Sequence, residues 1–145
     1  MPDPIPPALL GTWKLVSAIR EEVPSGVRTE LFGPTPVGFL NYSPDGRMMT
    51  VMVRGDRKRP AGHPIGNEDA LHLFRSLMSY AGTFEVRGDE VFHHVEVSAN
   101  EIWTGTHQQR FFKIDGDRIA LRTPVSQDPI DGKVSVRTMI WQKVK

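Results

Sequence analysis

The sequence predicts an all-β fold: an up-and-down antiparallel β-barrel of about eight to nine strands, interrupted by one α-helix. Short segments rich in β-branched and aromatic residues recur along the 145-residue chain, and tight-turn signals separate them. Only one segment repeats its apolar residues with helical spacing. Closing the sheet removes unpaired edge strands, which favours a barrel over an open sheet. The length predicts a single domain over residues 1–145.

The predicted strands lie between turns that contain Asp-Gly or Gly-Asp. These turns are Pro44-Asp45-Gly46, Arg87-Gly88-Asp89, Asp115-Gly116-Asp117 and Asp131-Gly132. A glycine in such a turn accepts the positive φ that a tight hairpin requires. We therefore expect strands at residues 12–22, 26–31, 37–43, 47–54, 82–87, 90–98, 107–115, 117–123 and 134–144.

One helix is predicted near the middle of the chain. Asn67 can cap the first helical turn, and the acidic Glu68 and Asp69 suit the positive end of a helix dipole. Apolar residues follow at spacings of three and four: Ala70, Phe74, Leu77 and Ala81. These features predict an amphipathic helix over about 68–80. It ends at Gly82 and plugs or flanks one end of the barrel.

Composition excludes several classes of protein. The 18 Lys and Arg residues nearly balance the 17 Asp and Glu residues, so we expect no nucleic-acid partner. No apolar run approaches the ~20 residues that span a bilayer, so we expect no membrane partner. The Pro-rich start lacks the features of a signal peptide, which favours a cytoplasmic location. The absence of cysteine excludes disulfides and thiolate chemistry.

Two features favour a cavity inside the barrel. The chain is rich in methionine, whose flexible side chain suits the wall of an irregular pocket. Polar residues also alternate with apolar ones in the predicted strands, and a few convergent polar groups among apolar walls are typical of a small-molecule site. In residues 90–98 one face carries Val91, His93, Val95 and Val97, and the other carries Phe92, His94, Glu96 and Ser98.

The first functional hypothesis is a protein that binds a small hydrophobic or amphipathic ligand inside the barrel. Apolar side chains would contact the body of the ligand, and polar ones would orient its carbonyl or hydroxyl group. The candidate ligand-binding residues are His94, Glu96, Gln108, Arg110, Phe112, Met48, Met52, Tyr80 and Trp103. The same polar residues could instead form a structural network that fixes the register of the barrel, and a solid core remains an alternative.

The second hypothesis is a cofactor-free isomerase, cyclase or dehydratase that uses the same cavity. His94, paired with Glu96 or Glu85, could act as a general base, and Tyr42 or Tyr80 could donate a hydrogen bond to a developing oxyanion. The sequence contains no phosphate loop or dinucleotide fingerprint, so we expect no cofactor. We expect no metal site, because adjacent His93 and His94 point to opposite faces of a strand. A homodimer is left open.

Several segments together resemble one known family. The Gly11-Thr12-Trp13 segment is similar to the Gly-x-Trp opening of lipocalins. Further similar segments are Phe32–Gly38, Asn41–Met48, Tyr80–Val86, His93–Ser98, Trp103–Thr106, Gln108–Arg110 and Gly116–Leu121. From about Leu9 to Val144, the chain resembles the bacterial and fungal lipocalin-like domain family, whose members are calycin-type barrels. The resemblance implies an up-and-down barrel with a small-molecule cavity. It also implies that Trp13 stacks under a late-strand arginine, either Arg137 or Arg122.

Overall fold

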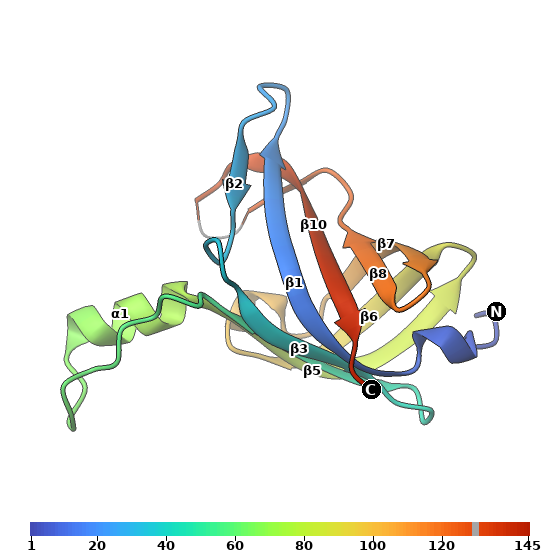
Figure 1. The fold of residues 1–145 in the computed structure, drawn as a ribbon, viewed down its shortest axis with the longest axis horizontal. Coiled ribbons are helices and arrows are strands. Elements are labelled where there is room, and N and C mark those ends of the chain that lie inside the picture. Colours follow the sequence, from blue (N-terminus) through green and yellow to red (C-terminus); the bar gives the residue numbers. More distant parts are fainter. Residues whose placement is uncertain (129–130) are drawn as a thin grey trace.

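The computed structural model describes residues 1–128 and 131–145 and contains a closed antiparallel barrel of eight strands (Figure 1). These strands are β1 (Gly11–Glu22), β3 (Val37–Tyr42), β4 (Arg47–Val53), β5 (Leu77–Arg87), β6 (Glu90–Ser98), β7 (His107–Asp115), β8 (Arg118–Arg122) and β10 (Val134–Lys143). Each pairs with the next in this order, and β10 pairs with β1, which closes the barrel. The predicted all-β up-and-down barrel is confirmed.

Two short strands extend one end of the barrel. β2 (Arg28–Glu30) pairs with the last part of β1, and β9 (Ser126–Gln127) pairs with the first part of β10. Because β1 and β10 are antiparallel partners, both additions lie at the same end, which we call the mouth. β9 was not predicted, since two residues are too short to show an alternating pattern.

Three of the predicted glycine-containing turns connect consecutive strands of the barrel. Gly46, Gly88 and Gly116 have φ values of 84°, 60° and 59°, in the left-handed region that favours glycine. Each lies in a turn between two consecutive strands of the barrel. Because these turns fix where the neighbouring strands end and begin, the strand boundaries agree closely with the prediction, except at the start of β5.

The helix is shorter than predicted. α1 covers Asn67–Arg75, and β5 begins at Leu77 rather than at residue 82. Residues 77–80 pair with residues 50–53 of β4, so long-range strand pairing replaces the last turn that the helical spacing predicted. No residue of α1 is buried, and the helix projects from the side of the barrel (Figure 1). It therefore flanks the mouth and does not plug it.

Gly82 has a different role from the predicted helix stop. It lies within β5, next to a bulge in the pairing with β6. A Cβ atom at this position would lie 1.9 Å from the carbonyl oxygen of His94. Glycine is required here because the backbones of β5 and β6 approach too closely for a side chain.

The end of the barrel opposite the mouth is closed by the N-terminal segment. The 3₁₀ turn η1 (Pro7–Leu9) places the buried Leu9 against Trp13, whose indole Nε1 donates a hydrogen bond of 3.0 Å to the Leu9 carbonyl. The Nζ atom of Lys143 lies 4.3 Å from the centre of the Trp13 ring. The expected stacking of Arg137 or Arg122 on Trp13 is therefore wrong, since a lysine from β10 occupies that position.

None of the helices in residues 1–128 and 131–145 has the length and apolar character needed to cross a membrane.

Candidate functional site

The alternation of β6 places His93, and not His94, inside the barrel. Val91, His93 and Val95 are buried, whereas His94 is half-buried on the outer face and Glu96 is exposed there. Three valines share the face of His93, whereas Phe92 is the one apolar residue on the face of His94. The alternation itself therefore favoured His93 as the inward residue, and the hypothesis that used His94 chose the other face.

His93 connects two buried tyrosines from other strands. Its Nε2 atom lies 2.6 Å from the Tyr42 hydroxyl on β3, and its Nδ1 atom lies 2.6 Å from the Tyr80 hydroxyl on β5. A neutral imidazole has one N–H donor and one acceptor nitrogen. One tyrosine must therefore donate to the ring while the other accepts from it. The neutral form of His93 satisfies both contacts in this way.

Burial keeps all three of these groups uncharged. It lowers the pKa of His93 well below the ordinary range, and the nearby positive charge of Arg110 acts in the same direction. Burial also raises the pKa values of Tyr42 and Tyr80. The array is thus a neutral hydrogen-bonded chain in the barrel interior at physiological pH.

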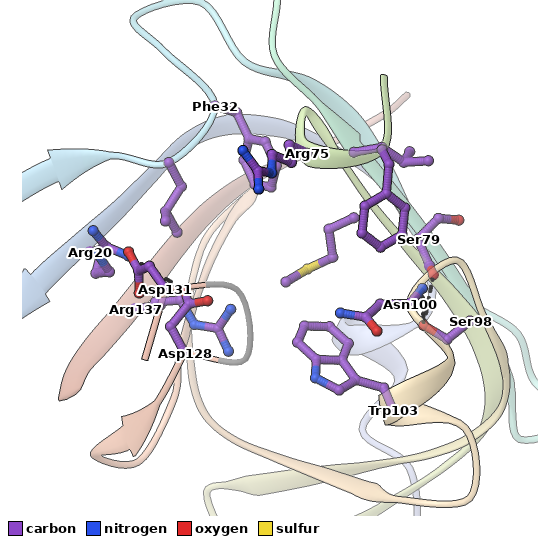
Figure 2. Close-up of a pocket in the computed structure, with 14 residues that line it drawn as sticks. Arg20, Phe32, Arg75, Ser79, Ser98, Asn100, Trp103, Asp128, Asp131 and Arg137 are labelled. Carbon is purple, nitrogen blue, oxygen red and sulfur yellow. Dashed lines mark hydrogen bonds and ion pairs between the residues drawn. The ribbon is translucent and has the colours of Figure 1, made fainter. Parts of the chain in front are cut away.

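The mouth contains a cavity of about 180 Å³ (Figure 2). Its apolar wall comes from the β2–β3 connection, the end of α1, the start of β5 and the 3₁₀ turn η2 (Glu101–Trp103). The apolar residues of this wall are Leu31, Phe32, Phe74, Leu77, Met78 and Trp103. Figure 2 shows Trp103 on one side of the cavity and the charged residues of β1 and β10 on another.

A charged group forms the polar side of the cavity. Arg20 of β1 is buried, and its Nη1 atom lies 2.6 Å from Asp131 Oδ2 and 3.4 Å from Asp128 Oδ2. The backbone N–H of Lys133 and the guanidinium of Arg20 both lower the pKa of Asp131. These contacts hold Asp128 and Asp131 against the wall of the barrel.

Arg137 lies directly across from Arg20 on the paired strand β10. Its side chain is buried, and its guanidinium carbon lies 5.7 Å from the centre of the Trp103 ring, a cation–π geometry. Burial, together with the positive charge of Arg110, lowers the pKa of Arg137 to about 10. The Arg137 guanidinium therefore stays protonated at neutral pH, although its charged form is less stable here than in water.

The predicted pair of His94 and Glu96 does not form. Glu96 accepts a hydrogen bond of 2.9 Å from Arg47, and both side chains are exposed. His94 instead contacts His107 through their Nδ1 atoms, and its Nε2 lies 2.7 Å from Glu85 Oε1. These contacts lie on the outer surface of the sheet, so His94 and Glu96 do not reach the cavity.

Of the other predicted ligand-binding residues, Trp103 alone lies on the wall of the mouth cavity. Tyr80 stands next to it, with its ring centre 5.8 Å from that of Trp103. Arg110 is buried and donates a 2.8 Å hydrogen bond to the Gln109 carbonyl. Gln108 donates to the Thr106 hydroxyl at 2.8 Å. Met48 and Met52 belong to the buried core, and Phe112 packs against it.

The sequence hypothesis missed most of the cavity wall. Arg137 could have been found, because it shares the alternating face of β10 with the buried Met139 and Trp141. The other missed residues lie mainly in connections, at the ends of strands or at the end of α1, where no alternation applies. These are Arg20, Leu31, Phe32, Phe74, Arg75, Leu77, Met78, Ser79, Ser98, Asn100, Asp128 and Asp131.

Comparison with known proteins agrees with this architecture. No curated protein sequence matches the chain. A family model described as a lipocalin-like domain matches residues 10–144, nearly the whole chain. On the strength of this match and the closed barrel, the chain belongs to the lipocalin-like domain family.

Proposed function

We propose that the protein binds a small amphipathic molecule in the cavity at the mouth of its barrel. The single observation that carries this proposal is the cavity itself, in which an apolar wall faces a small set of charged side chains. This combination is typical of small-molecule sites. The volume of about 180 Å³ is below the range of about 300–1,000 Å³ common for drug-sized ligands. The ligand is therefore small, or its tail extends past α1.

The aromatic residues of the wall suit this role. Trp103 and Phe32 are mostly buried, whereas Phe74 at the end of α1 is 41% exposed. An exposed phenylalanine at the rim of a cavity costs little if a ligand covers it. Binding would therefore bury apolar surface that the barrel leaves in contact with water.

The test is binding of the neutral fluorescent probe N-phenyl-1-naphthylamine, whose emission rises in apolar surroundings. We expect the probe to bind the wild-type protein. It should not bind the Met78→Trp variant, in which a larger side chain fills the cavity. The matched control is Met49→Trp, because Met49 lies on the outer face of the neighbouring strand β4 and is 64% exposed. Equal probe binding by both variants, or no binding by the wild type, would contradict the proposal.

The alternative, a cofactor-free isomerase, cyclase or dehydratase, is favoured by one observation. The chain of Tyr80, His93 and Tyr42 begins next to Trp103, so a ligand that passed Trp103 would meet a hydroxyl group coupled to an imidazole. This array replaces His94 and Glu96 as the candidate proton-transfer group. A ligand found by displacement of the probe should then be converted by the wild type and left unchanged by His93→Gln. Conversion by both proteins would contradict a role for His93.

A cytoplasmic location and a single domain stay predictions from the sequence, and a homodimer is still to be tested. Sedimentation of the purified chain would decide its oligomeric state.

A further inference from the structure

We propose that the mouth cavity selects ligands with an anionic head group, such as a carboxylate, and that Arg137 binds this group. The inference rests on the proposed function, and it names the chemical class of ligand that the site takes. It begins from the two arginines that face each other across the β1–β10 pair, Arg20 and Arg137. Both line the cavity, but their surroundings differ (Figure 2).

Arg20 forms ion pairs, whereas among the described residues Arg137 forms none, although the nearby carboxylate of Asp128 favours its charge. Arg20 forms ion pairs with Asp131 and Asp128 at 2.6 and 3.4 Å. Within residues 1–128 and 131–145, the guanidinium of Arg137 makes neither a hydrogen bond nor an ion pair, although its backbone N–H donates to the Thr123 hydroxyl at 2.9 Å. A buried guanidinium carries five N–H donors that favour a planar, two-oxygen acceptor. Arg137 therefore offers an unused carboxylate-binding group to the cavity.

The charges around Arg137 do not balance. Among the described residues, Arg20, Arg110 and Arg137 bring three positive charges into the mouth and the adjacent interior, against the carboxylates of Asp128 and Asp131. Glu22 also acts on Arg20, but it is paired with Lys133 at 3.8 Å. His93 is neutral, because burial lowers its pKa. Burial, followed by repulsion from Arg110, lowers the pKa of Arg137 to about 10, although Asp128 acts in the opposite direction. One bound monoanion would neutralise the excess charge.

The geometry also orients an amphipathic anion. Trp103 lies against the Arg137 guanidinium at 5.7 Å, so a head group at Arg137 would leave the ligand body beside the indole ring. From there the apolar wall continues through Met78 to Phe74 at the rim. A small hydrophobic acid fits this arrangement. Its head group would lie at β10, its body against η2 and β5, and its tail towards α1.

The test compares three ligands of equal chain length for displacement of N-phenyl-1-naphthylamine from the wild-type protein at neutral pH and low salt. The ligands are decanoate, decan-1-ol and decylamine. We expect decanoate to bind about tenfold or more tightly than decan-1-ol, since hydrogen bonds to a charged acceptor are the stronger ones. Decylamine should bind most weakly. Equal affinities for the acid and the alcohol, or preference for the amine, would overturn the inference.

Variants assign the preference to one residue. Arg137→Gln should weaken decanoate about 10- to 100-fold and leave decan-1-ol within about threefold, and Arg137→Lys should keep part of the preference. The control is Arg122→Gln on the neighbouring strand β8, where Arg122 is exposed and stacks on Phe111. Equal weakening of both ligands by Arg137→Gln would contradict the role of Arg137.

The two proposals fail in distinguishable ways. If the probe binds and no acid is preferred, the anion-binding inference is wrong and the binding function stands. If neither the probe nor any of the three ligands binds, the proposed function itself is wrong. The three-ligand comparison needs only the wild-type protein, so it decides the inference even if Arg137→Gln does not fold.

Discussion

At the scale of single residues, the two buried arginines of the mouth, Arg20 and Arg137, have opposite effects on the stability of the fold. Arg20 forms ion pairs with two carboxylates, whereas Arg137 is buried against Trp103 and forms no ion pair with the described residues. A buried charge without a partner destabilises a protein, and it is retained where it serves recognition. The two arginines should therefore respond in opposite ways to the same substitution.

Arg137→Met should stabilise the ligand-free protein, by on the order of 1–3 kcal/mol, because it replaces a buried cation with an apolar side chain of similar length. Arg20→Met should destabilise it by a similar amount, since Asp128 and Asp131 lose their shared cation. The free energy of unfolding in urea measures both effects. Destabilisation by Arg137→Met would show that the Trp103 contact outweighs the cost of burying the charge.

His93 should make the stability of the fold depend on pH. The folded state holds the neutral ring, whereas the unfolded chain protonates it near the ordinary pKa of 6.5. The unfolded state therefore binds the additional proton, and stability falls as the pH drops below about 6.5, with a slope of up to about 1.4 kcal/mol per pH unit.

His93→Gln keeps a donor and an acceptor but cannot titrate, so it should remove this part of the slope. His107→Gln, on the outer face, is the control and should keep it. Urea titrations between pH 5 and 8 measure both, and identical slopes for His93→Gln and wild type would exclude a buried neutral His93 as the cause.

At the scale of elements, α1 and β5 meet at a boundary that serves the cavity. α1 has no buried residue, so its contribution to stability is small, but its last turn carries Phe74 to the rim. β5 begins immediately afterwards and brings Met78 to the wall and Tyr80 to the buried array. The point where helix changes to strand thus decides which side chains surround the ligand.

Phe74→Ala should change the free energy of unfolding by no more than about 1 kcal/mol, because Phe74 lies on a helix with no buried residue and is 41% exposed in the ligand-free protein. The same change should weaken binding of N-phenyl-1-naphthylamine, since the rim loses apolar surface. Thermal unfolding and a fluorescence titration measure the two effects. Leu71→Ala, on the same helix and outside the cavity wall, should leave the titration unchanged.

Gly82→Ala should destabilise the barrel by about 1–3 kcal/mol, because the added methyl group would collide with the His94 carbonyl and force β5 and β6 apart. Gly62→Ala is the matched control. Gly62 lies in a loop where an added Cβ would meet no atom within 4 Å, so its effect should stay within about 0.5 kcal/mol. Urea denaturation measures both, and similar stabilities would contradict the close approach at β5.

At the scale of the whole molecule, stability and recognition belong to opposite ends of the barrel. The closed end is packed by Trp13 and Leu9, with Lys143 over the indole ring. The mouth is hollow, and its polar side carries an excess of positive charge. A substitution at one end should therefore alter one property without the other.

Trp13→Phe should cost about 1–3 kcal/mol, because it loses buried volume and the hydrogen bond to Leu9. It should leave the preference for decanoate over decan-1-ol unchanged, since the substituted ring lies at the end opposite the cavity. Urea unfolding and probe displacement on one preparation measure the two properties. A changed ligand preference would indicate that the two ends are coupled.

The sequence by itself determined the class of fold and most strand boundaries. Alternation within a strand and a glycine at a hairpin turn are local properties, which act over a few neighbouring residues. For this reason the turns at Gly46, Gly88 and Gly116 and the strands beside them could be read directly. The interior positions of Tyr42 and Arg110 could be proposed in the same way.

Only the tertiary structure decided where α1 ends, what His93 contacts and which arginine lacks an ion pair. His93 meets Tyr42 across 51 positions of sequence, and Arg20 meets Asp131 across 111. The contacts of a buried side chain depend on the other strands that pack against it, and an ion pair depends on the charged side chains that lie beside it. Both depend on segments far apart in the chain, whose proximity local patterns do not encode.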